Sequence, residues 1–118
     1  MNLNDSILLM VALDKNFDEY KLFIEMVDKY LHHILQGDTD VFIYYTCPNS
    51  FSRDLEDYFK CKDAVYSVFN LEGMIIDLVF QTIDCSFIIT GGKDEYIDGI
   101  IDKVKELDIK HRVIDFAR

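Results

Sequence analysis

The stretch Ile7-Leu8-Leu9-Met10-Val11-Ala12-Leu13 decides the fold, because its seven consecutive apolar residues leave no polar face toward water. Runs of this kind are typical of strands covered on both faces of a parallel sheet. We therefore predict a central strand over residues 7–13. A helix from Phe17 to Gln36 follows, with apolar residues at helical spacing, Asn16 as its N-cap and Gly37 as its stop.

The alternation of strand and helix continues to the end of the chain. Further strands are predicted over residues 41–46, 64–69, 85–90 and 111–116, and further helices over 51–59, 71–83 and 93–107. Short connections favour right-handed crossovers, so we predict a three-layer, doubly wound α/β fold with a parallel five-stranded, Rossmann-like sheet. The two most apolar strands, the first and the fourth, belong at the centre, which favours the order 3-2-1-4-5 over 2-1-3-4-5.

Length and charge exclude several classes of protein. The chain has 118 residues, which predicts a single domain over 1–118, and its 12 Lys and Arg against 22 Asp and Glu give a net charge of −10. Half of the residues are hydrophobic, which excludes a disordered acidic chain. The negative charge argues against direct nucleic-acid binding and against an anionic membrane surface, both of which require clustered Lys and Arg.

The cysteines and the start of the chain predict a location in the cytoplasm. Cys47, Cys61 and Cys85 form no C-x-x-C pair and no even framework, so neither a disulfide scaffold nor a zinc site is indicated. Residues 1–5 carry no basic charge, and the apolar run 7–13 is too short for a leader segment or a membrane span. No cofactor is indicated.

Three loops are the candidate ligand site. In the order 3-2-1-4-5 the topological switch lies between the first and fourth strands, and ligands of such sheets bind outside the carboxyl ends of the strands there. The loops that follow the first, second and fourth strands span residues 13–17, 46–52 and 90–96.

Both ends of the chain resemble the SLOG superfamily, Rossmann-like domains associated with nucleotides and nucleotide-derived ligands. Residues 14–22 (DKNFDEYKL) are similar to that family's loop and helix opening after the first strand. The last third of the chain is similar to another part of that family. Residues 83–93 (IDCSFIITGGK) match a strand and a Gly-Lys turn, and a helix and the family's final strand, here 112–114, follow. The resemblance covers about half of the chain and implies a Rossmann-like fold and a nucleotide-like ligand.

The middle of the chain departs from that family. The family carries a glycine-rich loop after the second strand, whose amides approach a phosphate, whereas this sequence has Cys47-Pro48-Asn49-Ser50-Phe51-Ser52-Arg53. The Arg-Asn stretch that the family has before its third helix is also missing. The resemblance therefore also fits a diverged member that has abandoned its site.

Cys47 and Arg53 form a C-x5-R motif between a strand and a helix. Cysteine-dependent phosphatases and arsenate reductases use this arrangement, because the helix N-terminus lowers the thiol pKa and the arginine holds phosphoryl oxygens bidentately. Pro48 removes one amide from the cradle, and Phe51 stands where a small residue is usual. The alternative is an idle thiol. An enzyme would also need a general acid, for which Asp14 is the best-placed candidate.

Thr90-Gly91-Gly92-Lys93 is a second candidate anion site. Glycines at a strand-to-helix junction free backbone amides for a ligand, although a tight turn that needs φ > 0 is the more frequent reason for such a pair. Together with Asp14, Lys15, Asn49 and Ser50, these residues make up the predicted ligand-binding set. If the three loops converge, Lys15, Arg53 and Lys93 would gather positive charge at the switch point of an acidic protein.

The last helix offers an acidic surface, and the third helix an apolar one. Asp94, Asp98, Asp102 and Glu106 recur every four residues, which predicts either a solvent-exposed face or a docking surface for a basic protein partner. The helix 71–83 is apolar nearly all round, which indicates a homodimer contact. His32 and His33 are adjacent and cannot share a helix face, so no metal site is predicted.

Three functions therefore remain open. The first is a protein that binds a nucleotide-like or phosphorylated ligand at the carboxyl edge of the sheet, without clear catalytic machinery. The second is a non-catalytic acidic module that binds a protein partner. The third is an enzyme with Cys47 as nucleophile and Arg53 as oxyanion clamp.

Overall fold

The computed structural model describes residues 6–14, 16–17, 19–34, 40–46, 49–61, 65–71, 76–91 and 94–116. Strands and helices alternate strictly along the chain. In order, the elements are β1 (Ser6–Leu13), α1 (Tyr20–Ile34), β2 (Asp40–Thr46), α2 (Asn49–Lys60), β3 (Val65–Asn70), α3 (Ile76–Thr82), β4 (Cys85–Thr90), α4 (Glu95–Glu106) and β5 (Lys110–Asp115).

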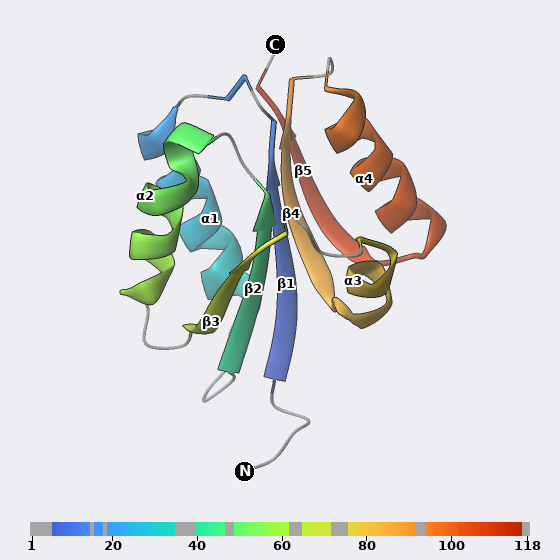
Figure 1. The fold of residues 1–118 in the computed structure, drawn as a ribbon, viewed down its shortest axis with the longest axis horizontal. Coiled ribbons are helices and arrows are strands. Elements are labelled where there is room, and N and C mark those ends of the chain that lie inside the picture. The colour runs from blue at the N-terminus through green and yellow to red at the C-terminus, as the bar shows by residue number, and fades with distance from the viewer. Residues whose placement is uncertain are drawn as a thin grey trace.

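The five strands form one parallel sheet in the order β3-β2-β1-β4-β5, which confirms the predicted fold and strand order (Figure 1). β1 is paired along both edges, with Leu9 opposite Ile43 of β2 and opposite Cys85 of β4. Every described side chain of β4 is buried, and β1 is buried from Leu9 onward. The apolar runs that marked these two strands therefore reflect burial on both faces of the sheet.

The helices cover the two faces of the sheet in pairs, as a doubly wound fold requires (Figure 1). α1 and α2 lie on one face, and α3 and α4 lie on the other. Alternate residues of each central strand enter the two cores: Leu9, Val11 and Leu13 pack with α1 and α2, whereas Met10 and Ala12 pack with α3 and α4.

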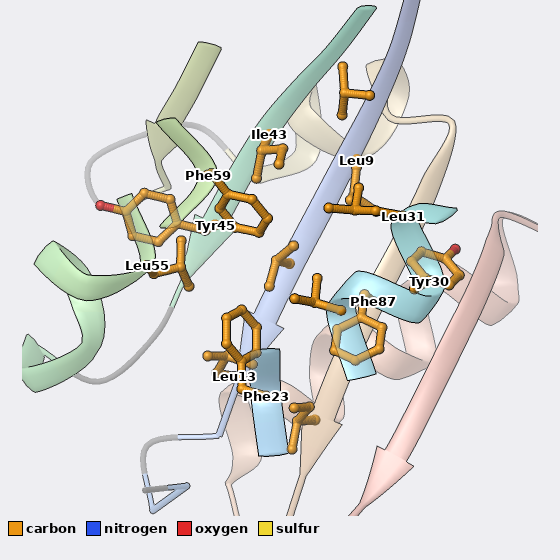
Figure 2. Packing of buried hydrophobic residues seen from close by; sticks show 14 of the residues in the cluster. Leu9, Leu13, Phe23, Tyr30, Leu31, Ile43, Tyr45, Leu55, Phe59 and Phe87 are labelled. Atoms are coloured by element: carbon orange, nitrogen blue, oxygen red, sulfur yellow. The ribbon is translucent and has the colours of Figure 1, made fainter. Parts of the chain in front are cut away.

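The core beneath α1 and α2 is rich in aromatic rings (Figure 2). Phe23 and Tyr30 project from α1, and Phe59 projects from α2 onto Ile43 of β2. Figure 2 also shows that α1 runs antiparallel to the strands, because Leu31 lies beside the start of β1 whereas Phe23 lies beside Leu13 at its end.

The first helix begins later than the sequence pattern indicated. α1 begins at Tyr20 and not at Phe17, because Phe17 turns into the core and stacks edge-on against Phe116 at a ring distance of 5.3 Å. α3 begins at Ile76, and residues 72–75 lie outside the described part of the chain. The contact predicted for the helix 71–83 remains a prediction, and Leu78 is its exposed large apolar side chain among the described residues.

β5 forms one edge of the sheet and is only partly covered. Lys110 and Arg112 are exposed, and Ile114 is half-buried against the core of α1 and α2. On the opposite face, Val113 packs against the core of α3 and α4. The α1 face of the sheet is therefore open over β5, whereas the side chains of β4 are buried.

None of the helices in the described ranges is long and apolar enough to cross a membrane.

The buried hydroxyl of Ser86 supplies a test of this core. Its side chain is fully buried in β4, and its oxygen has no hydrogen-bond partner among the described residues. Replacing such a group removes a desolvation penalty, so Ser86→Ala should leave the free energy of unfolding unchanged or raise it by up to about 1 kcal/mol. Urea denaturation measures the difference, with Ile88→Val as a control that should cost about 1 kcal/mol. A clear loss of stability in Ser86→Ala would contradict the assigned environment.

Candidate functional site

Hydrogen bonds of Asp14 link the carboxyl ends of the two central strands, β1 and β4. It follows β1 directly and is fully buried. Its Oδ1 accepts the amide of Asn16 at 2.9 Å, and its Oδ2 accepts the amide of Gly91 beyond β4 at 2.8 Å. Its own amide donates to the carbonyl of Ile89 at 2.9 Å. The geometry gives Asp14 a structural role at the switch point.

Glycine suits position 91 because two side chains crowd it. A Cβ atom there would lie 2.9 Å from the ring of Phe116 and 3.3 Å from Oδ2 of Asp14. The chain after β5 is held there by the amide of Phe116, which donates to the carbonyl of Thr90 at 3.0 Å. The rings of Phe17 and Phe116 complete this packing. Among the described residues, protein groups therefore fill the space between the ends of β1 and β4.

This packing bears on the predicted anion site. The sequence predicted that the amide of Gly91 binds a phosphate. In the structure this amide donates to the carboxylate of Asp14. A ligand there would have to displace that carboxylate, whose charge repels an anion. Thr90 is buried. Lys15, Gly92 and Lys93 lie outside the described residues, so their part in ligand binding stays a prediction.

The C-x5-R motif is only partly described. Cys47 and Pro48 lie outside the described residues. Asn49 and Ser50 open α2, but their side chains lie outside the described part. Arg53 is exposed on the first turns of α2. The convergence of Lys15, Arg53 and Lys93 therefore remains a prediction.

The acidic stripe of the last helix divides into one buried and three exposed residues. Asp94 is 7% exposed and caps α4, because its side chain accepts the amide of Tyr96 at 3.1 Å. Asp98, Asp102 and Glu106 are exposed, and Glu106 lies 3.8 Å from the ammonium of Lys103. The candidate docking surface therefore consists of the last three carboxylates.

Metal binding has little support in the described part of the chain. His32 is exposed on α1, and the side chain of His33 lies outside the described part. Within the described ranges, no three His, Cys, Asp or Glu side chains cluster as a metal ion would require.

A pocket of about 500 Å³ lies elsewhere, between α1 and the exposed strand β5, over Phe87 of β4. Its volume falls within the range of small-molecule sites, roughly 300–1,000 Å³. Its lining residues come from three elements: Met26, Lys29 and Tyr30 of α1, Phe87 of β4, and Lys110, His111, Arg112 and Ile114 of β5. No lining residue is acidic.

Among the described residues, no carboxylate forms an ion pair with the cations of this pocket. Lys29, Lys110 and Arg112 are all exposed, and none of them forms an ion pair with any residue in the described ranges. The nearby carboxylate of Asp28 instead accepts a hydrogen bond from Tyr58 of α2. Three unpaired positive charges thus share one concave surface of a protein whose net charge is −10.

Two buried rings form the floor of the pocket, and the buried thiol of Cys85 lies beside one of them, Tyr30. The rings of Tyr30 and Phe87 lie 5.5 Å apart, and both are buried (Figure 2). Burial, followed by the neighbouring Cys85 thiol, raises the pKa of Tyr30. Burial raises the pKa of Cys85 to about 11; Asp84 adds to this rise, whereas Tyr30 and Lys110 oppose it. Both groups are therefore uncharged near pH 7.

This pocket was not predicted from the sequence. Two periodic patterns contribute to its lining. Every second residue of β5 points to the same face of the sheet, which places Lys110, Arg112 and Ile114 together. On α1, helical spacing places Met26, Lys29 and Tyr30 on one face. These two patterns could have been found. The sequence does not show that α1 leaves β5 partly uncovered. This gap is where the residues of α1 and those of β5 line one pocket.

Comparison with known proteins adds no functional information: no protein-family model, curated protein or solved structure matches this chain.

The role of Asp14 can be tested by Asp14→Asn. The replacement keeps the size of the side chain but turns an NH₂ group toward one of the two backbone donors. We expect the free energy of unfolding to fall by about 1.5–3 kcal/mol in chemical denaturation, as for hydrogen bonds to charged groups. Asp102→Asn, at an exposed position of α4, is the matched control and should stay within about 0.5 kcal/mol of the parent protein. Equal stability of the two variants would contradict this linking role of Asp14.

The buried Cys85 predicts a loss of stability at alkaline pH. The folded protein holds the thiol proton up to about pH 11, whereas an ordinary thiol loses it near pH 9.0. Stability from this group is therefore complete below pH 9 and declines toward pH 11, with a slope of at most about 1.4 kcal/mol per pH unit. Tyr30 acts in the same direction at higher pH. Denaturation across pH 8–11 should show a shallower decline for Cys85→Ala, and identical slopes would contradict the assignment.

Proposed function

We propose that this chain is a binding domain for an anionic small molecule, held in the pocket between α1 and β5. The observation that carries the proposal is the set of three exposed cations, Lys29, Lys110 and Arg112, which have no ion-pair partner in the described ranges and surround one cavity of about 500 Å³. A phosphorylated ligand fits this chemistry, because guanidinium groups bind phosphate bidentately and lysines add point charge.

The charge of the whole protein makes this concentration of cations significant. The chain has 12 Lys and Arg against 22 Asp and Glu, and yet the pocket lining contains three of these cations and no carboxylate. A concave site of one sign focuses its field and attracts ions of the opposite sign.

The floor of the pocket favours binding over catalysis. Tyr30 and Cys85 are buried and stay protonated near pH 7, so neither supplies a ready base or nucleophile. Lys29 and Arg112 can hold an anion without reacting with it. The proposed domain therefore senses or carries its ligand.

The other hypotheses keep their own candidate residues. A ligand at the carboxyl edge would depend on Lys15, Lys93 and the loop of Asn49 and Ser50, and an enzyme would depend on Cys47. The acidic protein-docking hypothesis is favoured by one observation, the exposure of Asp98, Asp102 and Glu106 along α4. A cytoplasmic location, a SLOG-like ancestry and a homodimer contact through residues 71–83 remain proposals that these features neither require nor oppose.

An NMR titration with inorganic phosphate tests the proposal. Amide shifts should concentrate in the second half of α1 and in β4 and β5. Arg112→Gln should weaken binding about ten-fold or more, as expected when a bidentate charge-assisted contact is lost. Added NaCl should weaken binding as well, because the three cations are exposed to screening.

Arg53→Gln is the matched control, because Arg53 is also exposed but lies on α2. It should bind phosphate as the parent protein does. If Arg53→Gln abolishes binding and Arg112→Gln does not, the ligand site lies at the carboxyl edge and the proposal is wrong. Absence of any phosphate-dependent shift would also overturn it.

A further inference from the structure

The pocket is polarised along its length, and this polarity defines the class of ligand. Along β5, Lys110 stands opposite Cys85 at the start of β4, Arg112 stands opposite Phe87, and Ile114 stands opposite Ile89. Residues two apart on a strand share a face and are separated by about 6.6–7 Å. The strand thus presents two cations at its amino end and an apolar side chain toward its carboxyl end.

The helix repeats the same polarity. Because α1 runs antiparallel to the strands, Tyr30 and Leu31 lie near the amino end of the sheet and Phe23 lies near the carboxyl end (Figure 2). Lys29 therefore belongs to the end that holds Lys110, while Met26, about 4.5 Å earlier along the helix axis, belongs to the end that holds Ile114.

We infer that the pocket takes a phosphate monoester with an apolar body, its phosphate toward Lys29, Lys110 and Arg112 and its body toward Met26 and Ile114. This inference rests on the proposed function and names its ligand class. A dianionic phosphate matches a cluster of three positive charges better than a single carboxylate does. Met26 and Ile114 are half-buried, so an apolar body would cover surface that water now touches.

The size of the cavity supports a two-part ligand. A cavity of about 500 Å³ lies in the range that holds drug-sized molecules and greatly exceeds a bare phosphate ion. The buried rings of Phe87 and Tyr30 form a floor that offers apolar contact and no further charge. An inorganic anion would occupy the cationic end and leave the apolar end wet.

The test compares phenyl phosphate, inorganic phosphate and benzoate in binding titrations with the full chain. Phenyl phosphate should bind at least about ten-fold more tightly than inorganic phosphate, since a buried ring adds hydrophobic free energy. It should also bind more tightly than benzoate, which has the ring but a single charge. In NMR spectra, nuclear Overhauser effects should connect the ring protons of phenyl phosphate to the methyl groups of Met26 and Ile114.

Two variants show whether the apolar end produces this preference. Ile114→Ser and Met26→Ser should each reduce the affinity ratio of phenyl phosphate to inorganic phosphate by about three-fold or more. Met26 is half-buried on the helix surface, so its variant keeps the test usable if Ile114→Ser does not fold. Ile114→Val should retain the ratio and serves as the conservative control.

The outcomes separate this inference from the proposed function. If inorganic phosphate and phenyl phosphate bind equally in an Arg112-dependent manner, the anion site stands and the two-part ligand is wrong. If ring contacts appear beside Lys110 and not beside Ile114, the polarity is wrong. If neither compound binds, the proposed function fails together with the inference.

Discussion

The fold depends on the way in which one buried carboxylate joins the two central strands. Asp14 ends β1 and accepts the amide of Gly91 beyond β4 at 2.8 Å, while Gly91 admits the ring of Phe116 because it has no Cβ. The crevice that a doubly wound sheet normally offers to a ligand between its central strands is thereby closed by protein groups among the described residues. Binding at this edge would compete with an interaction that stabilises the sheet.

The same topology opens a second place for a ligand. α1 and α2 lie over one face of the sheet, but the edge strand β5 is left half open there. Lys110 and Arg112 of β5 line the same pocket as Lys29 of α1. The buried ring of Phe87 lies in its floor. The pocket thus results from the position of α1, which leaves β5 partly uncovered, and its charge results from the residues that alternate along this edge strand.

Much of the architecture could be predicted from periodicity, whereas the site could not. The run 7–13 and the fully buried β4 marked the centre of the sheet correctly, because burial on both faces excludes polar residues from such strands. The start of α1 was less predictable, because it depends on a contact between residues far apart in the sequence. Phe17 packs against Phe116, 99 residues away, and α1 begins only at Tyr20. The pocket depends on which strand a helix leaves uncovered, and no local pattern encodes that.

We propose that this acidic protein binds an organic phosphate between α1 and β5. A crystal structure of the full chain with 4-bromophenyl phosphate tests it most directly, because the anomalous signal of bromine locates the ring independently of the phosphate. The account predicts the phosphate beside Lys110 and Arg112 and the bromine beside Met26 and Ile114. Bromine density at the loops after β1, β2 and β4, with an empty α1–β5 pocket, would contradict it.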